Sequence, residues 1–203
     1  MKNFVIAIIA SVAVVAVAVL AVPRWKQAQR ANKASALLEE KYGAMGITAD
    51  QILSHEGAED AGKILGALCY RIGQKADTHG EHGLTDTERK FLAADWLEGE
   101  VDNGGFDQYF FNPSGDNSMV ALAGLREMGA SGAAALLERA VAVFPGGKPP
   151  TDTAKRREMM EQIAARSGPV WEQCDSEFYR LSESFSDLSL AYAKKKRAEI
   201  VLP

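Results

Sequence analysis

The chain has 203 residues, with 23 Lys and Arg against 27 Asp and Glu and a formal net charge of −4. This near-neutral total hides a segregation of charge, because residues 35–192 hold 14 basic and 26 acidic residues, a net charge of −12, between basic ends. A basic groove for nucleic acid is excluded, since binding phosphates requires clustered Lys and Arg. Two cysteines are too few for a disulfide scaffold.

The first segment of the chain is apolar and long enough to cross a membrane. Residues 4–22 contain no charged side chain and one polar one. A helix of that length, at about 1.5 Å per residue, nearly spans a hydrocarbon core of about 30 Å, which predicts an N-terminal transmembrane anchor over residues 1–23. The alternative is a signal peptide that is cleaved after the A-x-A pattern at 16–18, in which case the protein is exported.

Basic residues follow the apolar run, namely Arg24, Lys26, Arg30 and Lys33. The positive-inside rule therefore predicts a single-pass protein of the inner (cytoplasmic) membrane with its C-terminal domain in the cytoplasm. Cys69 and Cys174 lie on separate predicted helices and are expected to be buried thiols. A disulfide between them would favour the exported alternative.

The remaining sequence has helical signals throughout. Between residues 58 and 76, apolar side chains recur at the i, i+3, i+4, i+7 spacing of a one-sided helix. Thr48 with Gln51 and Thr85 with Glu88 form two capping boxes. No alternating β-branched run occurs. The predicted fold is an all-α, single multi-helix globular domain over 58–203, preceded by a basic stalk and leading helices over 24–57.

The helix boundaries follow from glycines, prolines and capping patterns. A loop is expected at 77–84, a helix break at Asn103-Gly104-Gly105 and a turn at 113–116. The expected helical segments are 37–42, a short helix opened by Thr48, 58–76, 85–102, 118–128, 131–144, 153–166, 169–181 and 185–198. A short aromatic element is expected at 106–111.

Residues 91–125 contain no Lys or Arg but hold six carboxylates: Asp95, Glu98, Glu100, Asp102, Asp107 and Asp116. At about 100° per residue, Glu88, Asp95, Glu98 and Asp102 fall within about 80° of one another and form one acidic stripe. Two interpretations stay open. The carboxylates form a solvated edge that favours solubility, or they are contact residues for a basic protein surface.

A second dense feature is the run E-V-D-N-G-G-F-D-Q-Y-F-F-N-P-S-G-D over 100–116. Its glycines suit a helix end that needs positive φ, its aromatic residues are expected to pack in the core, and Gln108 and Asn112 to hydrogen-bond exposed backbone ends. The residues to which we assign this structural role are Asn103, Gly104, Gly105, Phe106, Gln108, Tyr109, Phe110, Asn112 and Gly115.

This run resembles the signature of the bacterial DNA-mimic protein C-terminal domain family. Asp175–Tyr179 and Tyr192 also resemble that family's closing helices, so the resemblance covers roughly residues 60–200. It implies an all-α fold without enzymatic activity or cofactor. For the studied type of member, it implies an acidic protein that imitates DNA and occupies the DNA-binding surface of a transcription factor.

Catalytic chemistry has little support in the sequence. His79, Glu81 and His82 could offer two imidazoles and a carboxylate to a metal, which makes a metal-dependent enzyme one alternative, but a zinc site uses three or four ligands on a defined scaffold. Glycine-rich phosphate loops and the G-x-S-x-G pattern are absent. We therefore expect no catalytic residue, no metal and no cofactor.

Together these patterns predict a membrane-anchored, non-enzymatic interaction protein. Its acidic helical domain is expected to bind a basic protein surface, with a DNA-binding transcription factor as the candidate partner, and not to bind nucleic acid itself. The alternative is an exported or periplasm-facing domain with a binding or structural role. A homodimer is compatible with either interpretation.

Overall fold

The computed structural model of the chain describes residue 33 and residues 35–202. The apolar run over 4–22, and with it the predicted anchor, lies outside the described residues. Within the described part, no helix is long and apolar enough to cross a membrane. The described residues divide into two units, with the boundary between Ala44 and Met45. In the first unit residues 35–42 are helical, as the sequence predicts, and the helix ends where the 3₁₀ turn η1 (Gly43–Met45) begins.

The second unit is built of helices. Its only β contact among the described residues is an isolated bridge between Glu56 and Glu59, so the all-α prediction is confirmed. The α-helices are α2 (Ala49–Leu53), α3 (Ala61–His79), α4 (Asp86–Phe111), α5 (Ser118–Met128), α6 (Ser131–Val141), α7 (Thr153–Phe178) and α8 (Phe185–Lys195). Short 3₁₀ turns lie between them: η2 (Glu81–Gly83), η3 (Pro113–Asn117), η4 (Pro145–Gly147) and η5 (Arg197–Glu199).

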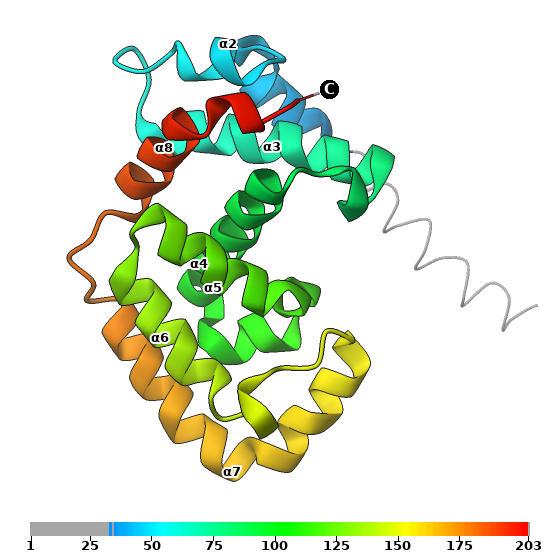
Figure 1. Ribbon diagram of the computed structural model, residues 1–203, viewed down its shortest axis with the longest axis vertical. Coiled ribbons are helices and arrows are strands. Elements are labelled where there is room, and N and C mark those ends of the chain that lie inside the picture. The colour runs from blue at the N-terminus through cyan, green and yellow to red at the C-terminus, as the bar shows by residue number, and fades with distance from the viewer. Residues whose placement is uncertain (1–32, 34, 203) are drawn as a thin grey trace, which may run out of the picture. The chain divides into compact units, whose positions relative to one another are not determined.

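Helix α4 runs through the middle of this unit (Figure 1). It packs against α3 on one side and against α5 and α7 on the other, and α6 lies between α5 and α7. Helix α8 packs on α3 and α5. Both predicted capping boxes are present, because Thr48 and Thr85 each accept a hydrogen bond from the backbone N–H three residues on.

The core beside the second half of α4 is aromatic. Phe106, Tyr109 and Phe110 have no exposed surface, which confirms their predicted core role. The Phe110 ring lies 5.0 Å from the ring of Phe144 and 5.1 Å from that of Trp171, centroid to centroid. These contacts join α4 to α7 and to the segment between α6 and η4.

The break predicted inside the α4 segment is confirmed at its glycines. Gly104 and Gly105 have non-helical dihedral angles, with φ at Gly105 of 76°. The helix resumes at Phe106, whose N–H donates to the Asp175 carboxylate of α7 at 2.8 Å. A side chain from another helix thus satisfies a donor that the break leaves without a helical partner.

Two predictions of helix boundaries differ most from the structure, the end of α3 and the division of α7. Helix α3 continues through Asp77 to His79 and ends at Gly80, which has a φ of 72°, so the loop predicted at 77–84 is shorter. The helices predicted at 153–166 and 169–181 are one helix, α7, that runs through Pro169. A proline removes one helical hydrogen bond, but buried Ile163 and Trp171 on either side hold the helix in the core.

A buried arginine closes the turn after α4. Arg156 of α7 has no exposed surface. Its Nε donates to the Phe110 carbonyl at 2.6 Å, and its Nη2 donates to the Asn112 carbonyl at 2.8 Å. Its Nη1 donates to the Pro150 carbonyl at 2.8 Å and to the Asp116 carboxylate at 2.5 Å. The guanidinium therefore replaces the hydrogen bonds that the last carbonyls of α4 lose at the helix end.

We expect Arg156→Met to lower the free energy of unfolding by about 3–5 kcal/mol, because it leaves buried acceptors without donors. Arg157→Met is the matched control. The Arg157 guanidinium lies on the Phe111 ring and donates to one carbonyl at the surface, so its loss should cost about 1 kcal/mol. Urea unfolding followed by circular dichroism measures both. Equal losses of unfolding free energy in the two variants would show that the buried contacts of Arg156 contribute no more to stability than the surface contacts of Arg157.

A second pair of variants tests the break in α4. In Gly105→Ala, the new Cβ would lie 2.3 Å from an Asp175 carboxylate oxygen at a positive φ, and we expect a loss of about 1–3 kcal/mol. Gly99→Ala lies on the helical part of α4 with no atom within 4 Å of the new Cβ, and should gain about 0.5–1 kcal/mol. Thermal unfolding of the two variants should shift in opposite directions.

Candidate functional site

Two of the six predicted contact carboxylates, Glu100 and Asp116, each accept several hydrogen bonds inside the domain. Glu100 accepts from Gln108 Nε2 at 2.7 Å, from Asn112 Nδ2 at 2.8 Å and from Ser114 Oγ at 3.0 Å. The expectation that Gln108 and Asn112 bond to exposed backbone ends is therefore wrong. The turn at the glycines places both amides beside Glu100, which ties the two parts of α4 together.

Asp116 is likewise engaged. Its carboxylate pairs with Arg156 at 2.5 Å and accepts from Thr153 Oγ1 at 2.9 Å. Gly115, just before it, has a structural role of its own, because a Cβ there would lie 2.7 Å from the Tyr109 carbonyl oxygen and 2.9 Å from Arg156 Nε. Glu100 and Asp116 are thus structural groups of the 100–116 motif, and we leave them out of the candidate site.

The acidic stripe on α4 lacks Glu88, the first of the four carboxylates that the helical spacing places in it. Glu88 has no exposed surface. It pairs with Lys75 of α3 at 2.8 Å and accepts the Val201 N–H at 2.7 Å, so it fixes the C-terminal segment to α3 and α4. The stripe therefore consists of Asp95 and Glu98, which are half-buried, and Asp102, which is exposed.

Two carboxylates that the sequence analysis missed extend this stripe. Asp175 of α7 interacts electrostatically with Glu172 of the same helix and with Asp107 of α4, because both raise the pKa of Asp175 after the larger effect of its burial. No local pattern could show that α7 lies along α4. We call the following six residues the acidic ridge: Asp95, Glu98, Asp102, Asp107, Glu172 and Asp175.

Tyr179 connects the two parts of the acidic ridge. Its hydroxyl donates to the Val101 carbonyl of α4 at 2.7 Å. Burial raises the pKa of Tyr179, and the charges of Asp175 and Asp102 raise it further. The α4 and α7 carboxylates therefore act on one phenol and belong to one electrostatic surface.

The ridge has no compensating cations. Across the described part of the chain, none of its six carboxylates forms an ion pair with Lys, Arg or His. Other carboxylates on the same helices do: Asp86 binds Lys90, and Glu177 binds Arg139 at 2.5 Å. Those hydrogen bonds lower the pKa of Asp86 and of Glu177. The ridge is thus a concentration of uncompensated negative charge.

The centre of the ridge is only partly ionised near neutral pH. Burial, and then the charges of Asp102 and Asp95, raise the pKa of Glu98 to about 7. Burial also raises the pKa of Asp95, against a hydrogen bond from the Cys69 thiol. Burial and the neighbouring Asp95 raise the pKa of Cys69 itself, so this thiol stays protonated as a donor. Cys69 and Cys174 are both free thiols.

A hollow of about 240 Å³ opens beside the ridge. Glu98 and Asp102 of α4 line one side. Most of the rest of the lining comes from the end of α7, the following loop and the first residue of α8. It combines apolar Phe178, Leu181 and Phe185 with Tyr179 and Glu183. This is the part of the ridge where charge and apolar surface meet.

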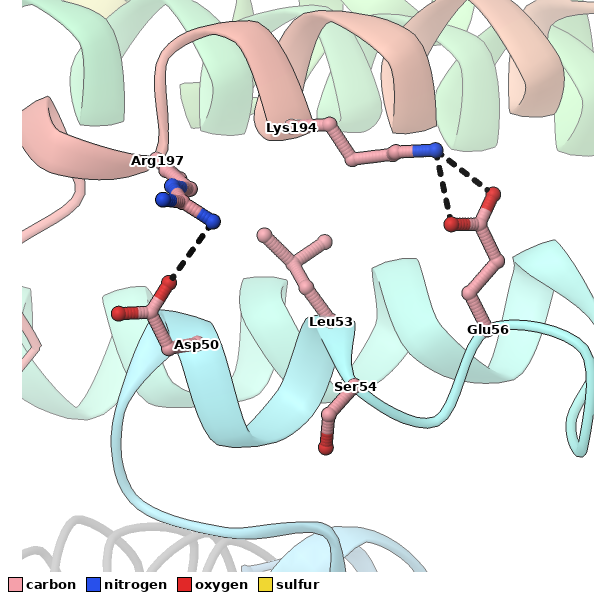
Figure 2. Close-up of a pocket in the computed structure, with 6 residues that line it drawn as sticks. All are labelled: Asp50, Leu53, Ser54, Glu56, Lys194 and Arg197. Carbon is pink, nitrogen blue, oxygen red and sulfur yellow. Dashed lines mark hydrogen bonds and ion pairs between the residues drawn. The ribbon is translucent and has the colours of Figure 1, made fainter.

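A second hollow, of about 450 Å³, lies between α2 and α8 (Figure 2). Leu53 lies between two ion pairs that cross it, Lys194 with Glu56 at 2.8 Å and Arg197 with Asp50 at 3.8 Å. Because these four charged side chains compensate one another, the hollow offers no excess charge to a ligand.

The metal-dependent alternative gains no support from the structure. No group of three or more His, Cys, Asp or Glu side chains in the described ranges is placed to hold a metal ion. Glu81, the carboxylate of the histidine-containing turn, instead accepts a hydrogen bond from Asn117 Nδ2 at 3.2 Å. A ligand set around His79 and His82 is therefore not formed.

Comparison with known protein families places most of the helical domain. The family model described as DMP19-like protein matches residues 82–196, which is more than half of the chain and includes helices α4 to α8, the 100–116 motif and the whole acidic ridge. No curated protein and no solved structure matches the chain.

We expect Glu98→Gln to flatten the pH dependence of stability. The pKa of Glu98 is about 7 in the folded chain, against an ordinary value of 4.5, so the folded state binds more protons between these values. The free energy of unfolding of the wild type therefore falls as pH rises through this window. The variant should lose that fall and be the more stable protein at pH 8. Urea unfolding from pH 4 to 8 measures it.

The matched control is Glu158→Gln, which removes an exposed glutamate of α7 away from the ridge. This variant should keep the pH dependence of the wild type. The assignment to Glu98 is refuted if both variants, or neither, change the slope of stability against pH.

Proposed function

The chain belongs to the DMP19-like protein family, and on this premise we propose that its helical domain is a non-enzymatic binding module that presents the acidic ridge to a DNA-binding protein in place of DNA. The match confirms the resemblance found at residues 100–116 and supports a protein-binding role. The observation that carries the proposal is the absence, over the described residues, of any cation paired with the ridge.

Electrostatics favours a basic partner. Unpaired carboxylates repel one another, and a surface rich in Lys and Arg removes that repulsion while it forms new ion pairs. A protein that binds DNA has such a surface, because it must neutralise phosphates. The acidic ridge and a DNA duplex can therefore compete for the same cations.

The spacing of the ridge is compatible with this role. Along α4, Asp95, Glu98 and Asp102 are separated by rises of about 4.5 and 6 Å at ~1.5 Å per residue. Successive phosphates of one DNA strand are about 3.4 Å apart along the axis. The carboxylates thus present charge at one to two phosphate steps, on a helix that α3, α5 and α7 hold in place.

The proposal extends to location. With residues 4–22 as an anchor, the basic residues that follow would keep the domain on the cytoplasmic side, where DNA-binding proteins are found. The free thiols of Cys69 and Cys174 suit a reducing compartment. Recovery of a mature protein that begins near Val19 would instead favour the exported binding or structural domain.

The test is competition with DNA. A DNA-binding protein captured on the full-length chain should be released by duplex DNA and should not bind both at once. Asp95→Asn, Glu98→Gln and Asp102→Asn combined should weaken its binding by at least about tenfold and make the salt dependence shallower, because three charges are lost with little change of shape. Fluorescence anisotropy at several salt concentrations measures both effects.

The matched control removes three charges elsewhere. Glu158→Gln, Glu161→Gln and Asp187→Asn change exposed residues outside the ridge and should leave the affinity within about twofold. A ternary complex with DNA, or equal losses in the two triple variants, would contradict DNA mimicry by the ridge.

A further inference from the structure

The hollow beside the ridge differs from the rest of the ridge in having an apolar wall. Its volume of about 240 Å³ is below the roughly 300–1,000 Å³ of sites for small-molecule ligands. It is more suited to a single long side chain. The carboxylates of Glu98, Asp102 and Glu183, together with the apolar side chains after α7, define what kind of side chain fits.

The apolar wall is held in place by contacts on each side. Phe178 is buried, with its ring edge on to that of Phe106 at 6.1 Å between centroids. The Tyr179 hydroxyl holds the following loop against α4 through the Val101 carbonyl. Further along, Glu183 accepts the N–H groups of Gly132 and Ala133 at 3.1 and 2.8 Å. The hollow is therefore formed before any partner binds.

The charges around the hollow are unbalanced. Glu183 is neutralised in part by the two N–H groups at the start of α6. Glu98 and Asp102 have no hydrogen-bond donor or cation in the described structure. No Lys, Arg or His lines the hollow. An occupant with positive charge at its tip and an apolar stem would match both walls.

We propose that this hollow receives an arginine side chain of the basic partner, with its guanidinium between the carboxylates of Glu98 and Asp102. The proposal rests on the proposed function and deepens it. A guanidinium is planar, can donate two hydrogen bonds to one carboxylate and stacks on aromatic side chains such as Phe178, Tyr179 and Phe185. Its methylene stem can lie along Leu181.

Binding of a cation here should release a proton. Glu98 faces Asp95 and Asp102 of its own helix, Cys69 of α3 next to Asp95, and Tyr179 and Glu183 across the hollow. All of these groups are negative or neutral. Burial, and then the charges of Asp102 and Asp95, raise the pKa of Glu98 to about 7. A guanidinium stabilises the ionised form and lowers that pKa. Near pH 6.5 the protonated fraction of Glu98 must then ionise as the ligand binds.

The experiment uses N-acetyl-arginine methylamide as the probe and N-acetyl-citrulline methylamide, its neutral isostere, as the control ligand. With the full-length chain, the arginine probe should shift the NMR signals of Ala133 and Leu181, and the citrulline compound should not. Calorimetry at pH 6.5 in two buffers of different ionisation enthalpy should show proton release. Binding should weaken about tenfold in Asp102→Asn and in Leu181→Ala.

The variants separate the contribution of the carboxylates, the contribution of the apolar side chains and the source of the released proton. Glu98→Gln should abolish the proton release, whereas Leu181→Ala should weaken binding and keep it. Leu53→Ala, in the hollow between α2 and α8, should change neither the affinity for the arginine probe nor the proton release. Equal binding of the citrulline compound, or tighter binding of N-acetyl-lysine methylamide, would overturn the assignment to a guanidinium.

This test and the DNA competition test can fail independently. If the arginine probe does not bind but DNA still displaces the captured partner, the hollow is not an arginine site and the proposed function stands. If the probe binds with proton release but the partner binds DNA and the chain together, the hollow is an arginine site on a protein that is not a DNA mimic.

Discussion

Arg156 is the cation around which the centre of the domain is built. Its guanidinium donates to three carbonyl oxygens and one carboxylate with no exposure to solvent. A buried charge is tolerated only when its donors are satisfied in this way. The same contacts leave no room for a side chain at Gly115. They also fix α7 against the end of α4, so the acidic ridge, which takes carboxylates from both helices, depends on them.

The carboxylates of this domain divide into two groups, those that accept several hydrogen bonds and those whose nearest charged neighbours are other carboxylates. Two or more hydrogen bonds from residues at least eight positions away reach each of Glu88, Glu100 and Glu183. These bonds connect separate segments of the chain. Glu98 of the ridge represents the second group: it is half-buried, and the charges of Asp102 and Asp95 act on it. The first group stabilises the fold, whereas the second costs stability through repulsion. A cationic partner offsets that cost, which is the physical link between the fold and the proposed function.

The features that could be predicted from sequence are those that local interactions decide. The capping boxes at Thr48 and Thr85, the break at Gly105 and the buried face of Phe106 and Phe110 each depend on residues within a few positions. The continuity of α7 through Pro169 depends on packing on both sides of the proline, which its own sequence does not show. The same holds for the site, because the acidic stripe of α4 was visible but its extension by Asp175 required knowledge that α7 lies beside α4.

A carboxylate ridge differs from a DNA backbone in one physical respect. The net charge of the ridge depends on its surroundings, since burial and the neighbouring charges raise the pKa of Glu98 to about 7. In the free chain this group is partly protonated at neutral pH, which reduces the repulsion within the ridge and the cost to folding. Contact with a basic surface favours its ionisation. On the proposed function, the imitation of DNA is therefore most complete in the bound state, and the partner itself supplies the positive charge that completes it.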